Sequence, residues 1–477
     1  MRRLLTLLAA ALPVVLIAPS AGTVPVPVVA SDNVELLATI PEVGAISTAF
    51  ASDEPLMYVN TLNGISVYDI SDPELPLLTG TLPMPHFENE AMAIGERLGQ
   101  RKDGTKFVLV GLDLYGATPT KPDAPNAGGY ELIVVDVTDP SAPTVRGRVV
   151  TDSSVHTIQC VNKACRYAYT SGAYDGGTFH VIDLKNLDKP KQIKALENLA
   201  GEGHQWDSDD KGVLWSTGFE GAAAYNVKDP LKPKALASTN MKGTESPYND
   251  FIMHNSYHPG AKRFKANAKP SLKNGNVLLV TEEDYDSPVC GGDAGEGTFS
   301  TWRIPYLSHK KTLKHNPKLT PNGGRMTPLD NWNTEILNSG QPTVAGAFCS
   351  AHYFTYHDSG FIAQGWYQQG TRILDVRNPR NIKQVGYFFT GASETWHAYW
   401  VPQRDKSGDV TGRDTNLIYT NDVARGIDVL EVELPKKKSG NTDPIEAPIL
   451  PQWLNATASI ASTPSKKYGY ICRVPLQ

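Results

Sequence analysis

The sequence of 477 residues lacks the features that mark several common classes of protein. Apart from the short run Lys436–Lys438 it has no basic block, and its formal net charge is −5, so a nucleic-acid partner is not expected. It also lacks a Gly-x-Ser-x-Gly elbow, a phosphate-binding Walker loop and a Cys-x-x-Cys redox motif. The chemistries that depend on those motifs are therefore not indicated.

Long apolar runs are also scarce, and only the N-terminal run raises the question of a membrane helix. It extends from Leu4 to Ala18 and is shorter than the roughly 18–20 clean apolar residues of a membrane span. Two arginines precede it and small residues follow it, with cleavage sites near Ala21 or Ala30, which is the pattern of a signal peptide. We therefore interpret residues 1–30 as a signal and expect a secreted, extracellular protein with no stable membrane anchor.

Cysteine is rare, with five residues in the chain. Cys160 and Cys165 flank a four-residue turn between two apolar runs, which predicts a local disulfide. Cys290 and Cys349 can form a second bond, which leaves Cys472 over, although spacing alone does not fix the connectivity. Export is compatible with such bonds, because they form in oxidising compartments.

A recurring phrase organises the rest of the chain. An apolar run ends at Asp or Asn, and an eight-residue frame that starts there closes on Pro in five of six copies. The frames start at Asp69, Asp136, Asp183, Asn226, Asp375 and Asp428. The apolar run predicts a buried strand, and Asp or Asn with Pro predicts a turn. Further strand-like runs before and after each phrase give four strands per repeat, which is typical of a propeller blade.

The phrase at Leu132–Asp136, LIVVD, resembles the LVIVD repeat. The resemblance extends over most of residues 33–435 and implies a β-propeller, but it implies no particular activity. Asn276–Thr281 and Thr298–Ile304 supply the second and third strands of one further, degenerate blade. We therefore expect an all-β, seven-bladed propeller.

The predicted domain boundaries follow from this count. The propeller spans residues 31–435, with an insertion at roughly 305–345 in blade five, and residues 436–477 form a C-terminal extension. The last blade lacks a fourth strand, and the run Val34–Thr39 fits that place. An N-terminal strand is therefore expected to close the ring, which removes two exposed sheet edges.

Histidines recur at the start of the predicted blades. Only 11 of 477 residues are histidine, and five of them open blades three to seven. They are His156, His204, His254, His352 and His397. His204 precedes the frame residue of its blade by 22 residues and His352 by 23. The remaining histidines lie deeper in the blades or out of phase, and we interpret them as structural.

The first strand of each blade lines the central channel, so these five side chains are expected to converge at one mouth. Imidazole is a ligand for transition metals, and the absence of thiolate from the set favours copper or iron over zinc. Glu90 opens blade two, where we expect it to orient an imidazole from outside the metal's own ligands. The alternative for the phased set is a structural ring that binds no metal.

The ends of the second strands lie at the same mouth and carry acidic and polar residues. They are Asp113, Tyr174, Asp175, Glu220, Glu282–Asp284, Tyr367, Gln368 and Asp422. Trp206, Trp366, Trp396 and Trp400 lie near in sequence, so we expect a pocket here for a small molecule or another extracellular ligand. Glu90 and Glu283 are the candidate proton-transfer residues.

Two hypotheses about function follow. The first is a secreted metalloprotein, an oxidoreductase with one metal on the propeller axis. In ligand placement alone it is similar to carotenoid-cleaving oxygenases and to the selenium-binding/methanethiol oxidase family. The second is a non-catalytic binding propeller that recognises a protein, glycan or cell-wall ligand. Calcium-dependent hydrolysis fits less well, because calcium prefers oxygen ligands to imidazole.

Overall fold

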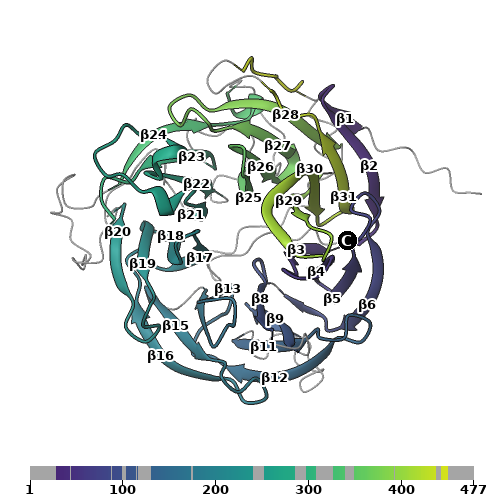
Figure 1. Cartoon of the computed structure of the whole chain (residues 1–477), viewed down its shortest axis with the longest axis vertical. Coiled ribbons are helices and arrows are strands. Elements are labelled where there is room, and N and C mark those ends of the chain that lie inside the picture. Colours follow the sequence, from purple (N-terminus) through teal and green to yellow (C-terminus); the bar gives the residue numbers. More distant parts are fainter. Residues whose placement is uncertain are drawn as a thin grey trace, which may run out of the picture.

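Seven antiparallel blades, six of four strands and one of five, surround a central axis (Figure 1). The computed structural model describes residues 28–42, 44–87, 89–98, 104–113, 115–116, 130–172, 176–239, 252–284, 297–307, 326–338, 349–390, 393–436 and 442–449. The predicted all-β, seven-bladed propeller is confirmed. In every blade the strand that comes first in the chain lies innermost, apart from the N-terminal strands that pair with blades six and seven. The side chains that open these inner strands can therefore converge on the axis.

The strands of each blade are arranged in order from the axis outwards. Blades one to four comprise β3 (Ala45–Phe50), β4 (Leu56–Thr61), β5 (Gly64–Asp69) and β6 (Leu77–Pro83); β8 (Ala93–Arg97), β9 (Thr105–Leu112), β11 (Glu131–Asp136) and β12 (Thr144–Val150); β13 (Thr157–Cys160), β14 (Tyr167–Ser171), β15 (Thr178–Asp183) and β16 (Lys191–Glu197); β17 (Gly203–Ser208), β18 (Val213–Gly218), β19 (Gly221–Asn226) and β20 (Lys234–Ser238).

The remaining blades are less regular. Blades five to seven comprise β21 (Ile252–Tyr257), β22 (Val277–Glu283), β23 (Phe299–Arg303) and β24 (Thr327–Trp332); β25 (Ala351–His357), β26 (Phe361–Trp366), β27 (Gly370–Asp375), β28 (Lys383–Thr390) and β1 (Val28–Ala30); β29 (Thr395–Arg404), β30 (Val410–Asp422), β31 (Gly426–Val432) and β2 (Val34–Ile40). Outside the blades, β7 (His86–Phe87) pairs with β10 (Tyr115–Gly116). The described helices are short: Ala261–Arg263, Leu272–Asn274, α1 (Glu335–Asn338) and Tyr367–Gln369.

The N-terminal strand closes the ring, as predicted. β2 pairs antiparallel with β31, from Val34 opposite Val432 to Ile40 opposite Ile427. The hydroxyl of Thr39 also donates to the carboxylate of Asp428 at 2.6 Å. The first and last parts of the chain therefore share one blade, and neither leaves its edge unpaired at this join.

The repeated Asp or Asn ends the third strand of five blades and forms a local turn. Its side chain accepts the backbone N–H of the residue two positions on, as in Asp69 to Ser71 at 2.7 Å and Asp136 to Thr138 at 2.9 Å. The sixth predicted frame residue, Asp428, is an exception because it lies in the middle of β31. The sequence pattern placed the end of this strand at Asp428, but β31 continues to Val432.

The apolar runs of the repeat are continuous because both faces of each blade are buried. Seven apolar clusters lie one at each junction between neighbouring blades. In β5, Ile65 and Val67 face blade two, whereas Tyr68 faces blade seven. A strand buried on both faces needs apolar residues at successive positions, which is the pattern of LIVVD.

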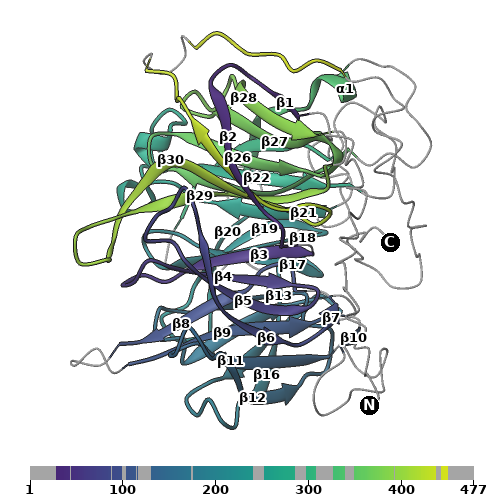
Figure 2. The same ribbon diagram turned by 90° about the vertical axis from the view of Figure 1, so that its right-hand side faces the viewer.

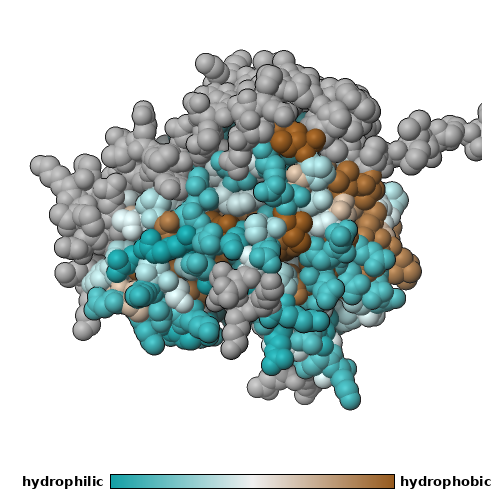
Figure 3. Space-filling view, turned by 90° about the horizontal axis from the view of Figure 1, so that it is seen from above, coloured by the Kyte–Doolittle hydropathy of each residue, from teal (hydrophilic) through white to brown (hydrophobic). Residues whose placement is uncertain are grey.

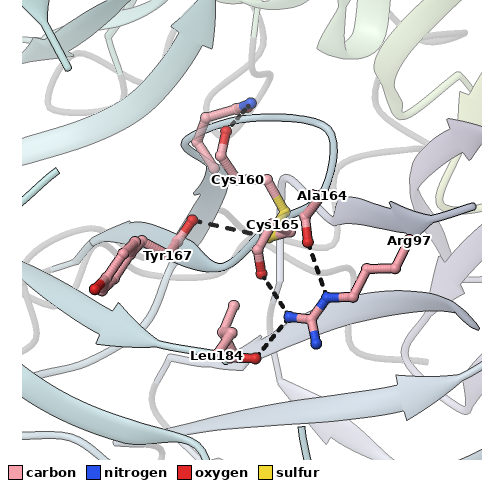
Figure 4. Close-up of a disulfide and its surroundings, with 7 residues drawn as sticks. Arg97, Cys160, Ala164, Cys165, Tyr167 and Leu184 are labelled. Carbon is pink, nitrogen blue, oxygen red and sulfur yellow. Dashed lines mark hydrogen bonds between the residues drawn. A yellow bond between two sulfur atoms is a disulfide. The ribbon is translucent and has the colours of Figure 1, made fainter. Parts of the chain in front are cut away.

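The predicted local disulfide is present. Cys160 and Cys165 are bonded across the hairpin between β13 and β14 (Figure 4). Arg97 of blade two reaches this hairpin, and its guanidinium donates to the carbonyls of Ala164 and Cys165 at 3.0 and 3.1 Å. Cys349 is also disulfide-bonded, which removes it as a metal ligand, while its predicted partner Cys290 lies outside the described residues.

Two segments extend the predicted architecture. β1 adds a fifth strand to blade six, with Val28 opposite Thr390, although it falls within the segment interpreted as a signal. β24 is the fourth strand of blade five and lies within the predicted insertion. Residues 442–449 of the predicted extension pack on blade six, where the Ile445 N–H donates to the Gln384 carbonyl at 2.9 Å.

The outer surface is mixed in character. Viewed from the edge of the disc, hydrophilic residues dominate, with apolar patches between them (Figure 3). Leu77 and Leu78 of the outer strand β6 are among the exposed apolar side chains. The long hairpin of β29 and β30 projects beyond the neighbouring blades (Figure 2). Within the described part of the chain, no helix is long and apolar enough to cross a membrane.

Truncation tests the unequal roles of the two N-terminal strands. Deletion through Ala30 removes only β1 and should cost about 1–3 kcal/mol of unfolding free energy, because few apolar contacts are lost. Deletion through Glu42 also removes β2 and exposes β31, a loss comparable with the total stability of roughly 5–15 kcal/mol. Denaturant unfolding measures both. Equal stability of the two truncated proteins would contradict ring closure by β2.

Candidate metal centre

The histidines reach the axis because the innermost strands carry an extra residue at that position. In β17 the pairing register with β18 shifts between Gly203 and Gln205, which leaves His204 as the additional residue. β21 shifts in the same way at His254, and β25 shifts at His352. A β-bulge redirects the side chain of the extra residue. Three imidazoles from consecutive blades are thereby aimed at one point.

Glu90 reaches the same point from the segment that precedes β8. Its backbone N–H donates to the carbonyl of His156 at 3.2 Å. The neighbouring Asn89 accepts from the Gly111 N–H through its side chain at 3.1 Å, and its carbonyl accepts from the Asn60 amide at 2.7 Å. These bonds anchor the segment to blades one, two and three, so the position of Glu90 is fixed by three blades.

The carboxylate of Glu90 lies among the Nε2 atoms of four histidines. Its Oε2 is 2.9 Å from Nε2 of His156 and 3.2 Å from Nε2 of His204. Nε2 of His254 is 3.4 Å from the same oxygen, and Nε2 of His352 is 3.1 Å from Oε1. All five side chains have no exposed area. We expected Glu90 to lie outside the ligand set and to orient an imidazole. Its carboxylate instead lies at the centre of the four histidines.

The ligand atoms form three overlapping groups, each with its atoms within 4.8 Å of one another. The groups are Glu90 with His156 and His204, Glu90 with His254 and His352, and Glu283 with His204 and His254. Two nitrogens bound at about 2.0–2.1 Å to one ion lie roughly 3–4 Å apart, so such clusters have the dimensions of a metal site. This set of nitrogen and oxygen atoms can hold a transition metal ion.

The opposite nitrogens of three rings have acceptors. They are Asp113 Oδ2 at 3.0 Å for His156, the His254 carbonyl at 3.1 Å for His204, and the Trp396 carbonyl at 2.8 Å for His352. A carbonyl oxygen can only accept, so Nδ1 of His204 and His352 carries a proton and Nε2 is the nitrogen that faces the cluster. Such outer hydrogen bonds orient the histidine ligands of metal sites.

His254 supplies a further sign of a ligand site. Both of its ring nitrogens are buried, and among the described residues Nδ1 has no hydrogen-bond partner. Buried polar groups are nearly always satisfied, so a ring with an unsatisfied nitrogen calls for an explanation such as an ion bound to the ring. The Nε2 atom lies near the carboxylates of Glu90 and Glu283, at 3.4 and 3.6 Å.

Each central carboxylate also has a tyrosine donor. The hydroxyl of Tyr353 donates to Oε2 of Glu90 at 3.2 Å, and the hydroxyl of Tyr367 donates to Oε1 of Glu283. Tyr353 follows His352 directly, and Tyr367 follows the end of β26. The sequence pattern gave Tyr367 as a mouth residue but gave no sign of Tyr353, because a tyrosine beside a histidine has no diagnostic spacing.

Burial and charge set the protonation states in the cluster. Burial opposes ionisation of Glu90, but the neighbouring histidines, His156 first, outweigh it and hold the pKa of Glu90 well below its ordinary value. Burial likewise opposes a charged His156, but Glu90 and Asp113 outweigh it and raise its pKa well above the usual range. Burial, followed by the charge of His156, lowers the pKa of His204 to about 4. Imidazoles bind metals in the neutral form, which His204 therefore has.

Two further groups respond mainly to burial. Burial lowers the pKa of His254 well below its ordinary value, which keeps this imidazole neutral. Burial also raises the pKa of Glu283 to about 7, and the charge of Glu90 adds to the effect while His352 opposes it. Glu90 and Glu283 are thus two carboxyl groups in one cluster with opposite pKa shifts.

His397 lies one residue out of phase with the other histidines. The register of β29 shifts between Thr395 and His397, so Trp396 occupies the place that His204 has in blade four. The ring of His397 stacks on Tyr353 at 4.6 Å and on Tyr399 at 3.6 Å. None of the three central groups contains it. A shift of one residue turns a side chain to the other face of a strand.

The other mouth residues divide between cluster and turn. Asp113, Glu283 and Tyr367 join the cluster, which confirms that second-strand ends share this end of the channel. Asp422 instead accepts the backbone N–H of Glu394 at 2.9 Å. Tyr174 and Asp175 lie outside the described residues.

Three of the four tryptophans expected near the mouth lie at the junctions between blades. Trp206, Trp366 and Trp396 are fully buried and Trp400 is 3% exposed. Trp206 lies between blades three and four, and Trp366 between blades five and six. Trp400 lies between blades six and seven, whereas the ring of Trp396 packs on His352 beside the axis, with centroids 5.1 Å apart.

His258, one of the histidines predicted to be structural, lies deeper in blade five and is held by hydrogen bonds. Its Nδ1 lies 2.9 Å from the Asp209 carboxylate, and its Nε2 lies 2.7 Å from the Gly275 carbonyl. The indole N–H of Trp215 donates to the same Asp209 at 3.2 Å. Both ring nitrogens of His258 are thus satisfied, in contrast with Nδ1 of His254.

Fold and site together define a seven-bladed β-propeller with a buried histidine–carboxylate cluster on its axis. Residues 127–151 match the LVIVD repeat family model, which confirms the resemblance drawn from LIVVD. Among solved structures, the chain is similar to the β-propeller domain of Cps50 (Swd1) from Myceliophteria thermophila, with a TM-score of 0.52 and 11% identity. That match covers 84% of this chain and 100% of the other, and at this identity it shows the fold alone. A comparison with curated proteins gave no match.

Proposed function

We propose that the protein is a secreted metalloprotein and that its axial cluster is the metal centre of an oxidoreductase. The supporting observation is the position of the Glu90 carboxylate among four histidine Nε2 atoms, at 2.9–3.4 Å, in a site with no exposed area. A buried carboxylate is costly unless it is paired or coordinates a metal. The carbonyl acceptors on Nδ1 of His204 and His352 support the same conclusion.

The donor set favours copper or iron over zinc. It consists of imidazole and carboxylate without thiolate, and imidazole is a ligand of both redox metals. Such an ion would supply redox or Lewis-acid chemistry to a bound small molecule. The chain itself orients the imidazoles of His204 and His352 through carbonyl acceptors on Nδ1 and buries the ligand atoms. Glu283, which lies 3.6 Å from His254 and accepts from Tyr367, is the proposed proton-transfer residue.

Secretion is the second part of the proposal. The N-terminal segment has the order of a signal peptide, and Cys160, Cys165 and Cys349 are all in disulfides. Disulfides are typical of exported proteins.

Metal content tests the centre directly. Protein purified without an affinity tag should contain copper or iron, and the double variant His204→Ala/His352→Ala should lose it while circular dichroism shows a folded propeller. His397→Phe is the matched control, because it keeps the stacked ring but removes a histidine outside the central groups, and it should retain the metal. Absence of metal from the wild-type protein, even after reconstitution with copper, iron and zinc, would leave the non-catalytic binding propeller as the function.

Redox chemistry is tested separately. Ascorbate or dithionite should change the absorption and electron paramagnetic resonance spectra of the loaded protein, and air should reverse the change. Glu283→Gln should retain the metal but slow reoxidation by roughly 100-fold or more, because a positioned proton donor contributes that much. A centre that selects zinc and shows no redox change would contradict an oxidoreductase.

Export is tested by the mature N-terminus. When the full chain is expressed in a secreting host, mass spectrometry of the exported protein should find cleavage near Ala21, because β1 (Val28–Ala30) then remains available to blade six. A mature chain that begins after Ala30 would show that β1 is dispensable. Retention of the uncleaved chain inside the cell would contradict secretion.

A further inference from the structure

We propose that the axial cluster holds two metal ions bridged by the carboxylate of Glu90. This inference rests on the proposed metal centre and changes its composition from one ion to two. The starting point is that two of the three ligand groups share Glu90 and no other residue. One contains His156 and His204, and the other contains His254 and His352.

The two oxygens of Glu90 face different histidines of the cluster. Nε2 of His156 lies 2.9 Å from Oε2, whereas Nε2 of His352 lies 3.1 Å from Oε1 and Nε2 of His254 lies 3.4 Å from Oε2. Among the described residues, no group with ligand atoms within 4.8 Å contains both His156 and His352. Ligands of one ion, even on opposite sides of it, lie about 4 Å apart at metal–ligand distances of 2.0–2.1 Å. One ion therefore does not reach both histidines, whereas two ions sharing a carboxylate do.

The two groups that contain Glu90 pair the histidines, and the pairs adjoin each other, because the ring centroids of His204 and His254 lie 3.9 Å apart. Nε2 of His156 and Nε2 of His204 are 2.9 Å apart, as expected for neighbouring ligands of one ion. The rings of His254 and His352 have centroids 4.1 Å apart and both approach Glu90. Each ion would then have two imidazoles and one carboxylate oxygen, which leaves open positions for water or substrate.

Two ions at this spacing would define the chemistry further. Protein sites with two metals place the ions about 3.5–4 Å apart and bind both ends of one small ligand. The substrate class is therefore a small molecule with an oxygen or nitrogen donor that bridges the pair. Tyr353 is a positioning residue for this bridge, because its hydroxyl donates to Oε2 of Glu90.

The test is the copper stoichiometry of the full secreted chain, measured by elemental analysis after loading with Cu(II) and removal of the excess. The wild-type protein and the His397→Phe control should bind two equivalents. His156→Ala and His352→Ala should each bind one, and the variant with both changes should bind none. Circular dichroism of each variant checks that it is folded.

Electron paramagnetic resonance of the wild-type protein provides a readout that does not depend on any variant. Two bridged Cu(II) ions should give a spin-coupled spectrum, and each single variant should give the spectrum of one isolated ion. One equivalent and an uncoupled signal in the wild type would overturn the two-ion proposal while the metal centre stands. Two uncoupled equivalents, with one unaffected by either variant, would place the second ion elsewhere and also overturn it. No bound copper would refute the metal centre itself.

Discussion

Closure of the ring by β2 is the constraint on which the functional site depends. β2 pairs with β31 over the length of the blade, so both parts of the chain share one sheet and the seven innermost strands face one axis. Glu90 of blade two and His352 of blade six are 262 residues apart in sequence and 3.1 Å apart in space. Without a closed ring, nothing local would hold these two side chains together.

Within the closed ring, one extra residue per inner strand decides which side chains reach the axis. The pairing shift aims His204, His254 and His352 inwards, and in blade seven it places Trp396 in the equivalent position. The apolar ring of Trp396 then packs on His352 with centroids 5.1 Å apart, and its carbonyl accepts from that histidine. Blades four to six each contribute a histidine at this position, whereas blade seven contributes a tryptophan that packs on one of these histidines.

Much of the fold was predictable because its cause is local and repeated. The LIVVD-type strand is apolar at every position since both faces are buried, and the following Asp or Asn closes a turn through its own side chain. The candidate site was only partly predictable. The position of histidines at the start of each blade correctly predicted four that converge. It wrongly added His397, because the spacing along the chain does not reveal a shift of one residue in strand pairing. Glu90 was recognised, but its central position was not.

The sequence by itself determined the blade count, the closing strand and the local disulfide at Cys160 and Cys165, because each depends on a short pattern of apolar, turn or cysteine residues. Only the tertiary structure decided which polar groups share the axis. Asp113, Tyr353 and Tyr367 join the cluster through blades that are distant in the chain, whereas Trp206, Trp366 and Trp400 lie at the junctions between blades. Convergence on an axis is a property of the closed ring, and no segment of the sequence contains it.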